Sequence, residues 1–260
     1  MRIALGIEYD GTAYNGWQRQ RTGDGVQARI EASLSRVANE TIEVTCAGRT
    51  DAGVHATGQV VHFDTSSERT PRGWLLGANT SLPDDINVSW ATPVADSFHA
   101  RFSAVSRSYR YRILNRLVRS ALDRHRAWWV YQPLDERLMH EAALALLGQH
   151  DFSAFRAAGC QASTAVRELM AVSVVREDDW VFLDVTANAF LQHMVRNIMG
   201  TLVAIGIGDK PADWAATVLQ SRDRKQGGMA APPHGLTLVG VDYPAEYRLP
   251  GNRNLDKMPR

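Results

Sequence analysis

Apolar side chains follow two different periods along this chain, and their alternation narrows the folds open to it more than any other feature. Between residues 3 and 9 every second side chain is large and apolar, which predicts a half-buried strand. Between residues 26 and 37 apolar side chains recur every three or four positions, which predicts an amphipathic helix. By the same criteria we expect strands at 41–46, 58–64, 86–92, 108–114, 171–175, 181–187 and 236–243, and helices at 134–147 and 190–205. Both halves of the chain therefore mix strands and helices, which is typical of an α+β protein.

Turn and capping residues mark where these elements end. Asp24 and Gln27 have the spacing of a capping box, so we expect Asp24 to cap the first helix. Pro133 and Gly148 bracket the second helix. No linker rich in Pro, Gly or Ser divides the halves. We place the boundaries by element order, giving 1–105, 106–245 and an irregular tail at 246–260.

The composition excludes several classes of protein. Hydrophobic residues make up 45% of the 260 residues, enough for a sizeable core. The two cysteines, Cys46 and Cys160, lack metal-binding spacing, which argues against structural zinc and fits a reducing compartment. Glu8 and Asp10 interrupt the N-terminal apolar run too early for a signal peptide, and the uncharged stretch at 198–208 is too short to span a bilayer. We therefore expect a soluble cytoplasmic protein without a membrane segment.

Basic charge is concentrated in one part of a chain whose formal net charge is only +1. The stretch 101–126 holds eight arginines and a single acidic residue, Asp123. Arginine presents a planar fork of donors that suits phosphate and stacks on bases, so this concentration fits a bound polyanion. For a charge run taken alone, a solvated basic face is the preferred explanation.

A glycine-rich loop between two expected strands surrounds a single carboxylate. The glycines are Gly48, Gly53 and Gly58, and the carboxylate is Asp51. Glycines let a backbone turn tightly and approach a ligand, and the flanking strands give the loop a rigid base. A carboxylate placed there, with the cation of Arg49 two residues away, suits a nucleophile or a base. Asp between glycines is also ordinary turn chemistry, and the spacing alone favours that explanation.

The helix expected at 190–205 has an unusual polar face. Its members follow helical spacing: Gln192, His193, Arg196, Asn197 and Gly200. Arg196 is the one charged residue among them, whereas exposed helix faces usually carry several charges. This sparse charge favours a face that lines a polar cleft over a solvated face. His193 has no second ligand at suitable spacing, so we discount a metal site.

Aromatic side chains alternate with arginines near the middle of the chain. Strand alternation over residues 106–112 puts Tyr109 and Tyr111 on one face and arginines on the other. Another such cluster lies just upstream, at 98–102. Aromatics among arginines suit stacking on unpaired bases with phosphate contact. The alternative is that the tyrosines are core residues; we prefer it for Tyr111, and for Tyr109 the pattern leaves both open.

Several familiar catalytic motifs are absent from the sequence. It contains no P-loop, no GxGxxG, no GxSxG and no HExxH. Nucleotide hydrolysis, dinucleotide redox chemistry, serine hydrolysis and zinc proteolysis all lose support.

Four sequence blocks resemble those of one known family. The blocks are GRTDAGVH at 48–55, FHARFSA at 98–104 with RSYRY following at 107–111, NAFLQHMVRNI at 188–198, and APPHGLTL at 231–238. In these blocks, and in their order between residues 1 and 243, the chain resembles the tRNA pseudouridine synthase A family, bacterial enzymes that act on the anticodon arm. The loop at 161–165 departs from the family, because it lacks the basic residue that relatives often carry there.

The resemblance implies a fold and an activity. It implies an α+β pseudouridine synthase fold of two RRM-like, ferredoxin-like halves, with a mixed, largely antiparallel sheet and a basic cleft between them. It implies a homodimer that grips one tRNA across both subunits. The implied reaction isomerises uridine to pseudouridine at positions 38, 39 and 40 of the tRNA anticodon stem-loop, with no metal and no small-molecule cofactor.

The resemblance also assigns roles to individual residues. It implies that Asp51 is the catalytic carboxylate and that Arg49 beside it contacts RNA. Tyr109 is implied to lie against the target uracil, and Arg196 to pair with Asp51. The remaining tRNA contacts that it implies come from Arg69 and from Phe98, His99, Ala100, Arg101 and Phe102.

Two other classes of function are weighed against this one. A non-catalytic RNA-binding protein of two RRM-like halves would explain the arginines and aromatics, but not the glycine-bracketed Asp51 or the sparse polar helix face. Another base-modifying chemistry, such as deamination or methyl transfer, lacks zinc ligands or a cofactor loop in this sequence.

Overall fold

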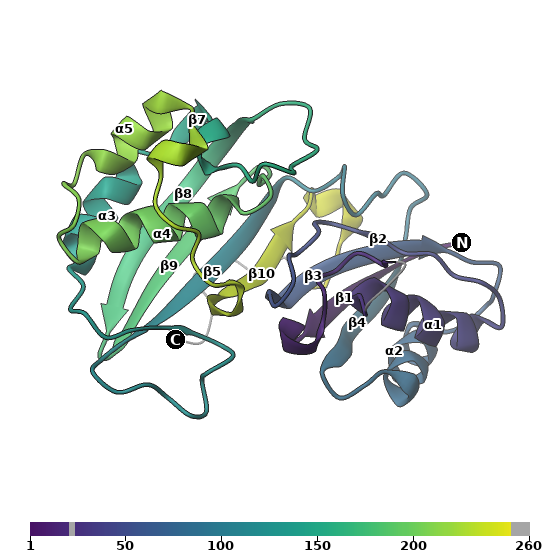
Figure 1. The fold of residues 1–260 in the computed structure, drawn as a ribbon. Coiled ribbons are helices and arrows are strands. Elements are labelled where there is room, and N and C mark those ends of the chain that lie inside the picture. Colours follow the sequence, from purple (N-terminus) through teal and green to yellow (C-terminus); the bar gives the residue numbers. More distant parts are fainter. Residues whose placement is uncertain (21–23, 251–260) are drawn as a thin grey trace. The chain divides into compact units, whose positions relative to one another are not determined.

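The computed structural model describes residues 1–20 and 24–250, which divide into two compact units. Unit 1 is Met1–Ser106 together with the chain from Leu238 on, and unit 2 is Arg107–Thr237 (Figure 1). The last strand therefore belongs mostly to unit 1, although we expected it within a second half at 106–245. Of the expected tail at 246–260, the residues from 251 on lie outside the described residues.

Unit 1 has the element order of a ferredoxin-like fold. Its elements are β1 (Arg2–Tyr9), α1 (Val26–Ala38), β2 (Thr45–Cys46), β3 (His55–Asp64), α2 (Pro71–Ser81), β4 (Ile86–Val94) and the greater part of β10 (Leu236–Asp242). Strands β4, β1 and β3 are neighbours and antiparallel, and β2 pairs with β3. The order β4-β1-β3-β2 is that of the RRM-like half expected from the resemblance. Strand β10 also lies beside β3.

The hydrophobic core of unit 1 lies between the sheet and its two helices. Ile3 of β1 is the cross-strand neighbour of Phe63, so both side chains lie on the same face of the sheet. The Phe63 ring packs edge-on against Trp74 of α2, with ring centroids 5.1 Å apart. Figure 1 shows α1 and α2 on the same side of this sheet. The strand predicted for residues 3–9 is confirmed, but it is not half-buried, because Ala4 and Gly6 on its other face are buried as well.

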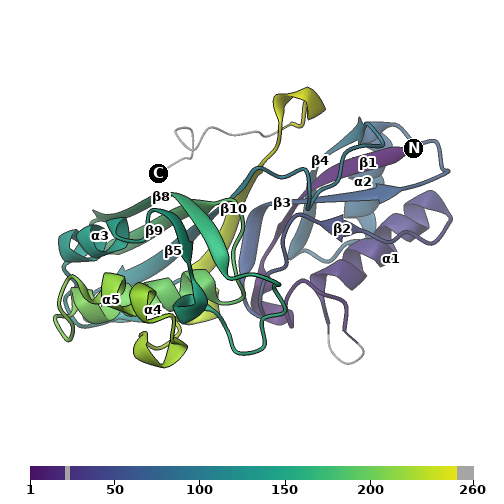
Figure 2. The same ribbon diagram turned by 90° about the horizontal axis from the view of Figure 1, so that it is seen from above.

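Unit 2 also combines strands with helices, in an order different from that of unit 1. Its elements are β5 (Ser106–Asn115), β6 (Trp128–Val130), α3 (Glu136–Leu144), β7 (Gly148–Asp151), β8 (Val166–Glu177), β9 (Trp180–Ala187), α4 (Met194–Gly206) and α5 (Trp214–Ser221). The strand order is β5-β9-β8-β7 with antiparallel pairs, and β6 pairs with β5 in parallel. Figure 2 shows α4 and α5 on the same side of β5 and β9. The predicted α+β class with a mixed, largely antiparallel sheet is confirmed.

Two predicted helix starts are wrong. The N-cap of α1 is Gly25, without a side-chain cap; Asp24 accepts a hydrogen bond from Arg29 instead. Helix α3 begins at Glu136 rather than 134, because Asp135 is its N-cap and accepts from two backbone N–H groups. It also ends at Leu144, before the predicted stop.

Two helices were not predicted at all. Helix α2 contains Gly73 and Gly77, which dilute its apolar period. Its start is nevertheless marked in the sequence, because Thr70 caps it and Pro71 occupies the first turn. Helix α5 is only eight residues long, too short for a clear period. Among the described helices, none is both long and apolar enough to cross a membrane.

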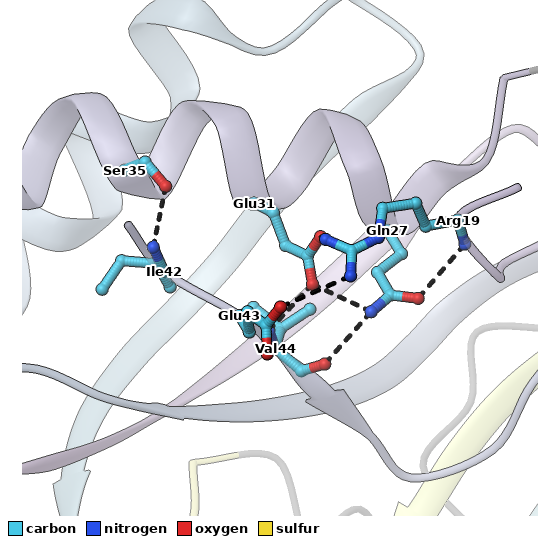
Figure 3. A network of polar contacts seen from close by, with 7 residues as sticks. All are labelled: Arg19, Gln27, Glu31, Ser35, Ile42, Glu43 and Val44. Atoms are coloured by element: carbon cyan, nitrogen blue, oxygen red, sulfur yellow. Dashed lines mark hydrogen bonds and ion pairs between the residues drawn. The ribbon is translucent and has the colours of Figure 1, made fainter. Parts of the chain in front are cut away.

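A buried glutamate ties α1 to the segment that leads into β2. Glu31 is 5% exposed, and its carboxylate accepts from Gln27 Nε2 at 2.8 Å and from the backbone N–H of Val44 at 3.1 Å (Figure 3). Arg19 forms a salt bridge with it at 3.0 Å. These contacts hold residues 42–44 against the helix, so the strand predicted at 41–46 shrinks to the two residues of β2.

Replacing Glu31 with Ala should lower the free energy of unfolding by about 2–4 kcal/mol, because it leaves buried donors without an acceptor. Urea unfolding measures this. The matched control is Glu43→Ala, since Glu43 is largely exposed and lies 3.4 Å from the same arginine. That variant should change the free energy by less than about 0.5 kcal/mol. Equal effects of the two substitutions would contradict the role assigned to Glu31.

Candidate active site

The loop that carries Asp51 is attached to the chain segment that follows β1. The buried Thr50 accepts the backbone N–H of Trp17 on its carbonyl at 3.0 Å, and its hydroxyl lies 2.7 Å from the Tyr9 hydroxyl. The backbone N–H of Gly53 donates to the Tyr14 carbonyl at 3.3 Å. Hydrogen bonds on both sides of Asp51 therefore fix the backbone that presents its carboxylate.

Two glycines of this segment permit that close contact. A Cβ on Gly11 would lie 2.1 Å from the Val54 carbonyl oxygen, and one on Gly16 would lie 2.7 Å from that of Thr50. Gly16 also has a φ of +94°, which side chains rarely adopt. The N–H of Gly11 donates to His55 Nδ1 at 3.0 Å, at the start of β3. The segment thus lies backbone to backbone against the loop.

The three residues at the centre of the loop differ in exposure. Arg49 is exposed, Thr50 is buried and Asp51 is half-buried. The thiol of Cys46 lies close behind; its burial raises its pKa to about 11, opposed by the charges of Arg49 and Arg101. Both arginines therefore act on one buried group at the base of the loop.

The predicted RNA-contacting segment of unit 1 has a buried and an exposed side. Phe98 and Ala100 are completely buried. Arg101 is exposed, and Phe102 is 75% exposed, with the Arg101 guanidinium 5.4 Å from the centre of its ring. Phe98 and Ala100 are therefore core residues, and the surface available to RNA comes from their neighbours. Arg69 is exposed just before α2.

The two tyrosines of β5 have different surroundings. Tyr111 is completely buried, and its hydroxyl donates to the Pro232 carbonyl at 2.6 Å. Its interpretation as a core residue is confirmed. Tyr109 is 8% exposed and packs edge-on against Phe190 at 5.0 Å. Tyr109 is thus buried against an aromatic neighbour, and its contact with the target uracil stays a prediction.

The interpretation of the polar helix face is wrong. Helix α4 begins at Met194, so Gln192 and His193 precede it, and His193 has a left-handed backbone with a φ of 64°. Asn197 is buried and donates to the Phe155 carbonyl at 2.8 Å. A Cβ on Gly200 would lie 1.7 Å from a backbone oxygen of the chain that crosses it. The face carries little charge because it packs inside unit 2.

Arg196 is the one charged residue of this predicted face. It is half-buried, and its Nε donates to the Ala231 carbonyl at 2.8 Å. The backbone N–H of Ala231 donates in turn to the Arg196 carbonyl at 3.0 Å. The hydrogen bond from Nε therefore ties the guanidinium group to the backbone at Ala231. Arg196 and Tyr109 belong to unit 2 and Asp51 to unit 1, and the pairing of Arg196 with Asp51 stays a prediction.

The arginine-rich stretch contains fewer exposed charges than its composition suggests. Three of its members are engaged within unit 2: Arg107 with the Asn188 carbonyl, Arg110 with Asp184 and Arg116 with Asp179. Arg116 is still exposed, and so are the other five, of which Arg124 donates to the Ala121 carbonyl: Arg101, Arg112, Arg119, Arg124 and Arg126. Phosphate contacts are therefore expected first from these five.

The sequence interpretation missed the residues that hold the loop. No periodic signal marks Gly11, Tyr14, Gly16 and Trp17, because their contacts with the loop use backbone atoms. Within residues 1–20 and 24–250, no three His, Cys, Asp or Glu side chains are grouped to hold a metal ion.

Comparison with known proteins identifies the family. A family profile described as tRNA pseudouridine synthase matches residues 6–103 and 142–244. The protein named tRNA pseudouridine synthase A from Pseudoalteromonas atlantica is 56% identical over 250 residues, covering 96% of this chain and 95% of the relative. The protein of that name from Xanthomonas axonopodis pv. citri is 55% identical over 252 residues, covering 96% of this chain and 98% of the relative. The one from Coxiella burnetii is 53% identical over 249 residues, covering 96% of this chain and 95% of the relative. The chain belongs to the tRNA pseudouridine synthase family.

Replacing Gly16 with Ala should lower the free energy of unfolding by about 2–4 kcal/mol, because it adds left-handed strain to a backbone clash. Chemical denaturation measures this. The control is Gly240→Ala in β10, where an added Cβ meets nothing within 4 Å and which should change the free energy by less than about 0.5 kcal/mol. If Gly16→Ala is as stable as the parent, the backbone contact with the loop is not a constraint.

Proposed function

We propose that this protein is an isomerase that converts uridine to pseudouridine at positions 38, 39 and 40 of the tRNA anticodon stem-loop. The observation that carries the proposal is the family match over most of the chain, with Asp51 of the matching motif on a loop fixed from both sides. An RNA-binding protein without catalysis is the less favoured alternative, because simple binding does not require such a loop.

The reaction accounts for the chemical groups that the site offers. The bond from ribose C1′ to uracil N1 breaks, the ring turns, and a new bond forms between C1′ and C5. The C5 proton leaves and N1 gains a proton, so nothing is oxidised and no group is exchanged with another molecule. A carboxylate near the sugar can attack covalently or assist departure of the base. We assign this role to Asp51.

The target base must leave its stack before it can react. Flipping a base out of an RNA stem costs a few kcal/mol, and an aromatic face that replaces the lost stacking recovers about 1–3 kcal/mol. We assign that face to Tyr109, which already packs against Phe190. Arg49 contacts the RNA beside Asp51, and Arg196 pairs with Asp51 during the reaction.

Further contacts bind the tRNA backbone. We assign phosphate contacts to Arg69, to Arg101 and to the exposed arginines of unit 2, because guanidinium groups bind phosphate oxygens in pairs. Phe102 offers an exposed ring for stacking on an unpaired base. We further propose that the protein is a cytoplasmic homodimer that holds one tRNA across both subunits, as the family resemblance implies.

Replacing Asp51 with Asn tests the proposal. Asn has nearly the same size but cannot ionise and is a very poor nucleophile, so the variant should fold, bind tRNA like the parent and lose essentially all turnover. Turnover is measured as release of tritium from C5 of uridine in tRNA, since that hydrogen must leave.

The matched control is Asp84→Asn, which makes the same change at an exposed position just before β4. It should keep parental turnover. Tritium release at the parental rate by the Asp51 variant would make Asp51 a turn residue and end the mechanism proposed above.

A further inference from the structure

Two histidines lie against each other behind the exposed pair Arg101–Phe102. His62 belongs to β3 and is buried, and His99 lies in the segment after β4 and is half-buried. Their ring centroids are 4.8 Å apart. The catalytic steps described above use neither residue, and His99 has entered so far only as part of the segment implied to contact tRNA.

Both imidazoles accept backbone hydrogen bonds. His62 Nδ1 accepts the N–H of Ala100 at 3.1 Å. His99 Nδ1 accepts the N–H groups of Arg101 and Phe102, both at 3.2 Å. A nitrogen that accepts such bonds carries no proton, so this arrangement requires both rings to be neutral. Protonation of Nδ1 would turn each acceptor into a donor that faces another donor.

The bonds to His99 close a single tight turn. The N–H of His99 donates to the Ser103 hydroxyl at 3.0 Å, and the N–H of Ser103 donates back to the His99 carbonyl at 2.9 Å. The His99 side chain accepts hydrogen bonds from the backbone N–H groups two and three residues later in the chain. In such turns the accepting side chain is usually Asn or Asp. The Phe102 ring lies over the His99 ring, with centroids 4.3 Å apart.

The base of the turn is fixed to the sheet of unit 1. The Tyr243 hydroxyl donates to the Ala100 carbonyl at 2.7 Å, and Arg2 donates to the Phe98 carbonyl at 2.8 Å. His62 is also the cross-strand neighbour of Thr45, next to Cys46 at the base of the Asp51 loop. The turn is therefore held on the same sheet that positions that loop.

We propose that His99, supported by His62, is a positioning residue for tRNA binding: its neutral ring holds the turn that presents Arg101 and Phe102, and its protonation releases that turn. This inference rests on the proposed function, because it assumes that the turn contacts tRNA. The affinity for tRNA should then fall in mild acid, although histidine protonation usually strengthens binding to a polyanion.

The charged groups around the pair favour the neutral rings. Burial, followed by the charges of Arg2 and His99, lowers the pKa of His62 to about 4. Asp64 acts in the opposite direction but is itself paired with Arg2 at 2.7 Å. Burial first, and then Arg2 and Arg101, lower the pKa of His99.

The pH dependence follows from the sign of these shifts. Because both pKa values are lowered in the fold, the folded turn is most stable above the ordinary histidine pKa of about 6.5. That stability is lost as the pH falls below that value toward the lowered pKa values.

Two substitutions at His99 distinguish the contribution of its hydrogen-bond acceptor from that of its aromatic ring. His99→Phe keeps an aromatic ring but has no acceptor, whereas His99→Asn keeps an acceptor for the same N–H groups and cannot titrate. We would measure the Kd for a full-length unmodified tRNA transcript between pH 5 and 8 at constant salt. At pH 7.5 the Phe variant should bind about tenfold more weakly than the parent, which corresponds to the loss of two hydrogen bonds of ordinary strength.

The parent should lose about tenfold in affinity between pH 7.5 and pH 5, and the Asn variant should stay within about threefold over that range. Parental affinity in the Phe variant, or a parental pH profile in the Asn variant, would overturn the proposal.

Arg101→Ala distinguishes a failure of this inference from a failure of its premise. It should weaken binding and flatten the dependence of log Kd on log salt, because it removes a phosphate contact. If it binds with parental affinity and salt dependence, the turn does not contact tRNA, and the proposed RNA surface rather than the role of His99 is wrong.

Discussion

The backbone of residues 11–17 packs directly against the loop that carries Asp51, and the arrangement of the proposed site depends on this contact. Side chains would hold the two segments apart, so glycines stand where they approach most closely, at Gly11 and Gly16. The hydrogen bonds from Trp17 to Thr50 and from Gly53 to Tyr14 then fix the backbone on either side of Asp51. A catalytic carboxylate needs a defined direction relative to the sugar, and this packing fixes the backbone that presents it.

The sheet of unit 1 supports the loop from its two faces with different chemistry. On the helix side, the Glu31 carboxylate accepts hydrogen bonds from a side chain of α1 and from the backbone of the segment that leads into β2. On the other side, His62 and His99 accept backbone N–H groups of the turn that carries Arg101. Both sets of hydrogen bonds give a partner to a buried backbone N–H group, that of Val44 on one side and that of Ala100 on the other. Arg49 of the loop and Arg101 of the turn are both exposed cations that can meet an RNA phosphate.

Much of the fold could be predicted from the sequence, because β1, β3, β5, β9 and α1 carry clear apolar periods. Helix α2 could not, since its glycines interrupt the period, and α5 is too short to show one. The prediction for the polar face of α4 was wrong because the spacing of polar residues does not show what they contact. Asn197 forms a hydrogen bond inside unit 2, and the same spacing would be seen if it faced a cleft. Asp51 was found through its motif, whereas Gly11–Trp17 was missed, because contacts between backbones leave no pattern in side chains.

The account depends most on whether this protein makes pseudouridine in tRNA with its own residues alone. Purified protein would be incubated with an unmodified tRNA transcript, without added metal or cofactor, and pseudouridine would be mapped along the whole RNA. The account predicts pseudouridine at uridines among positions 38, 39 and 40 and none elsewhere. A transcript that is bound but contains no pseudouridine after prolonged incubation would contradict it and would favour a protein that binds RNA without modifying it.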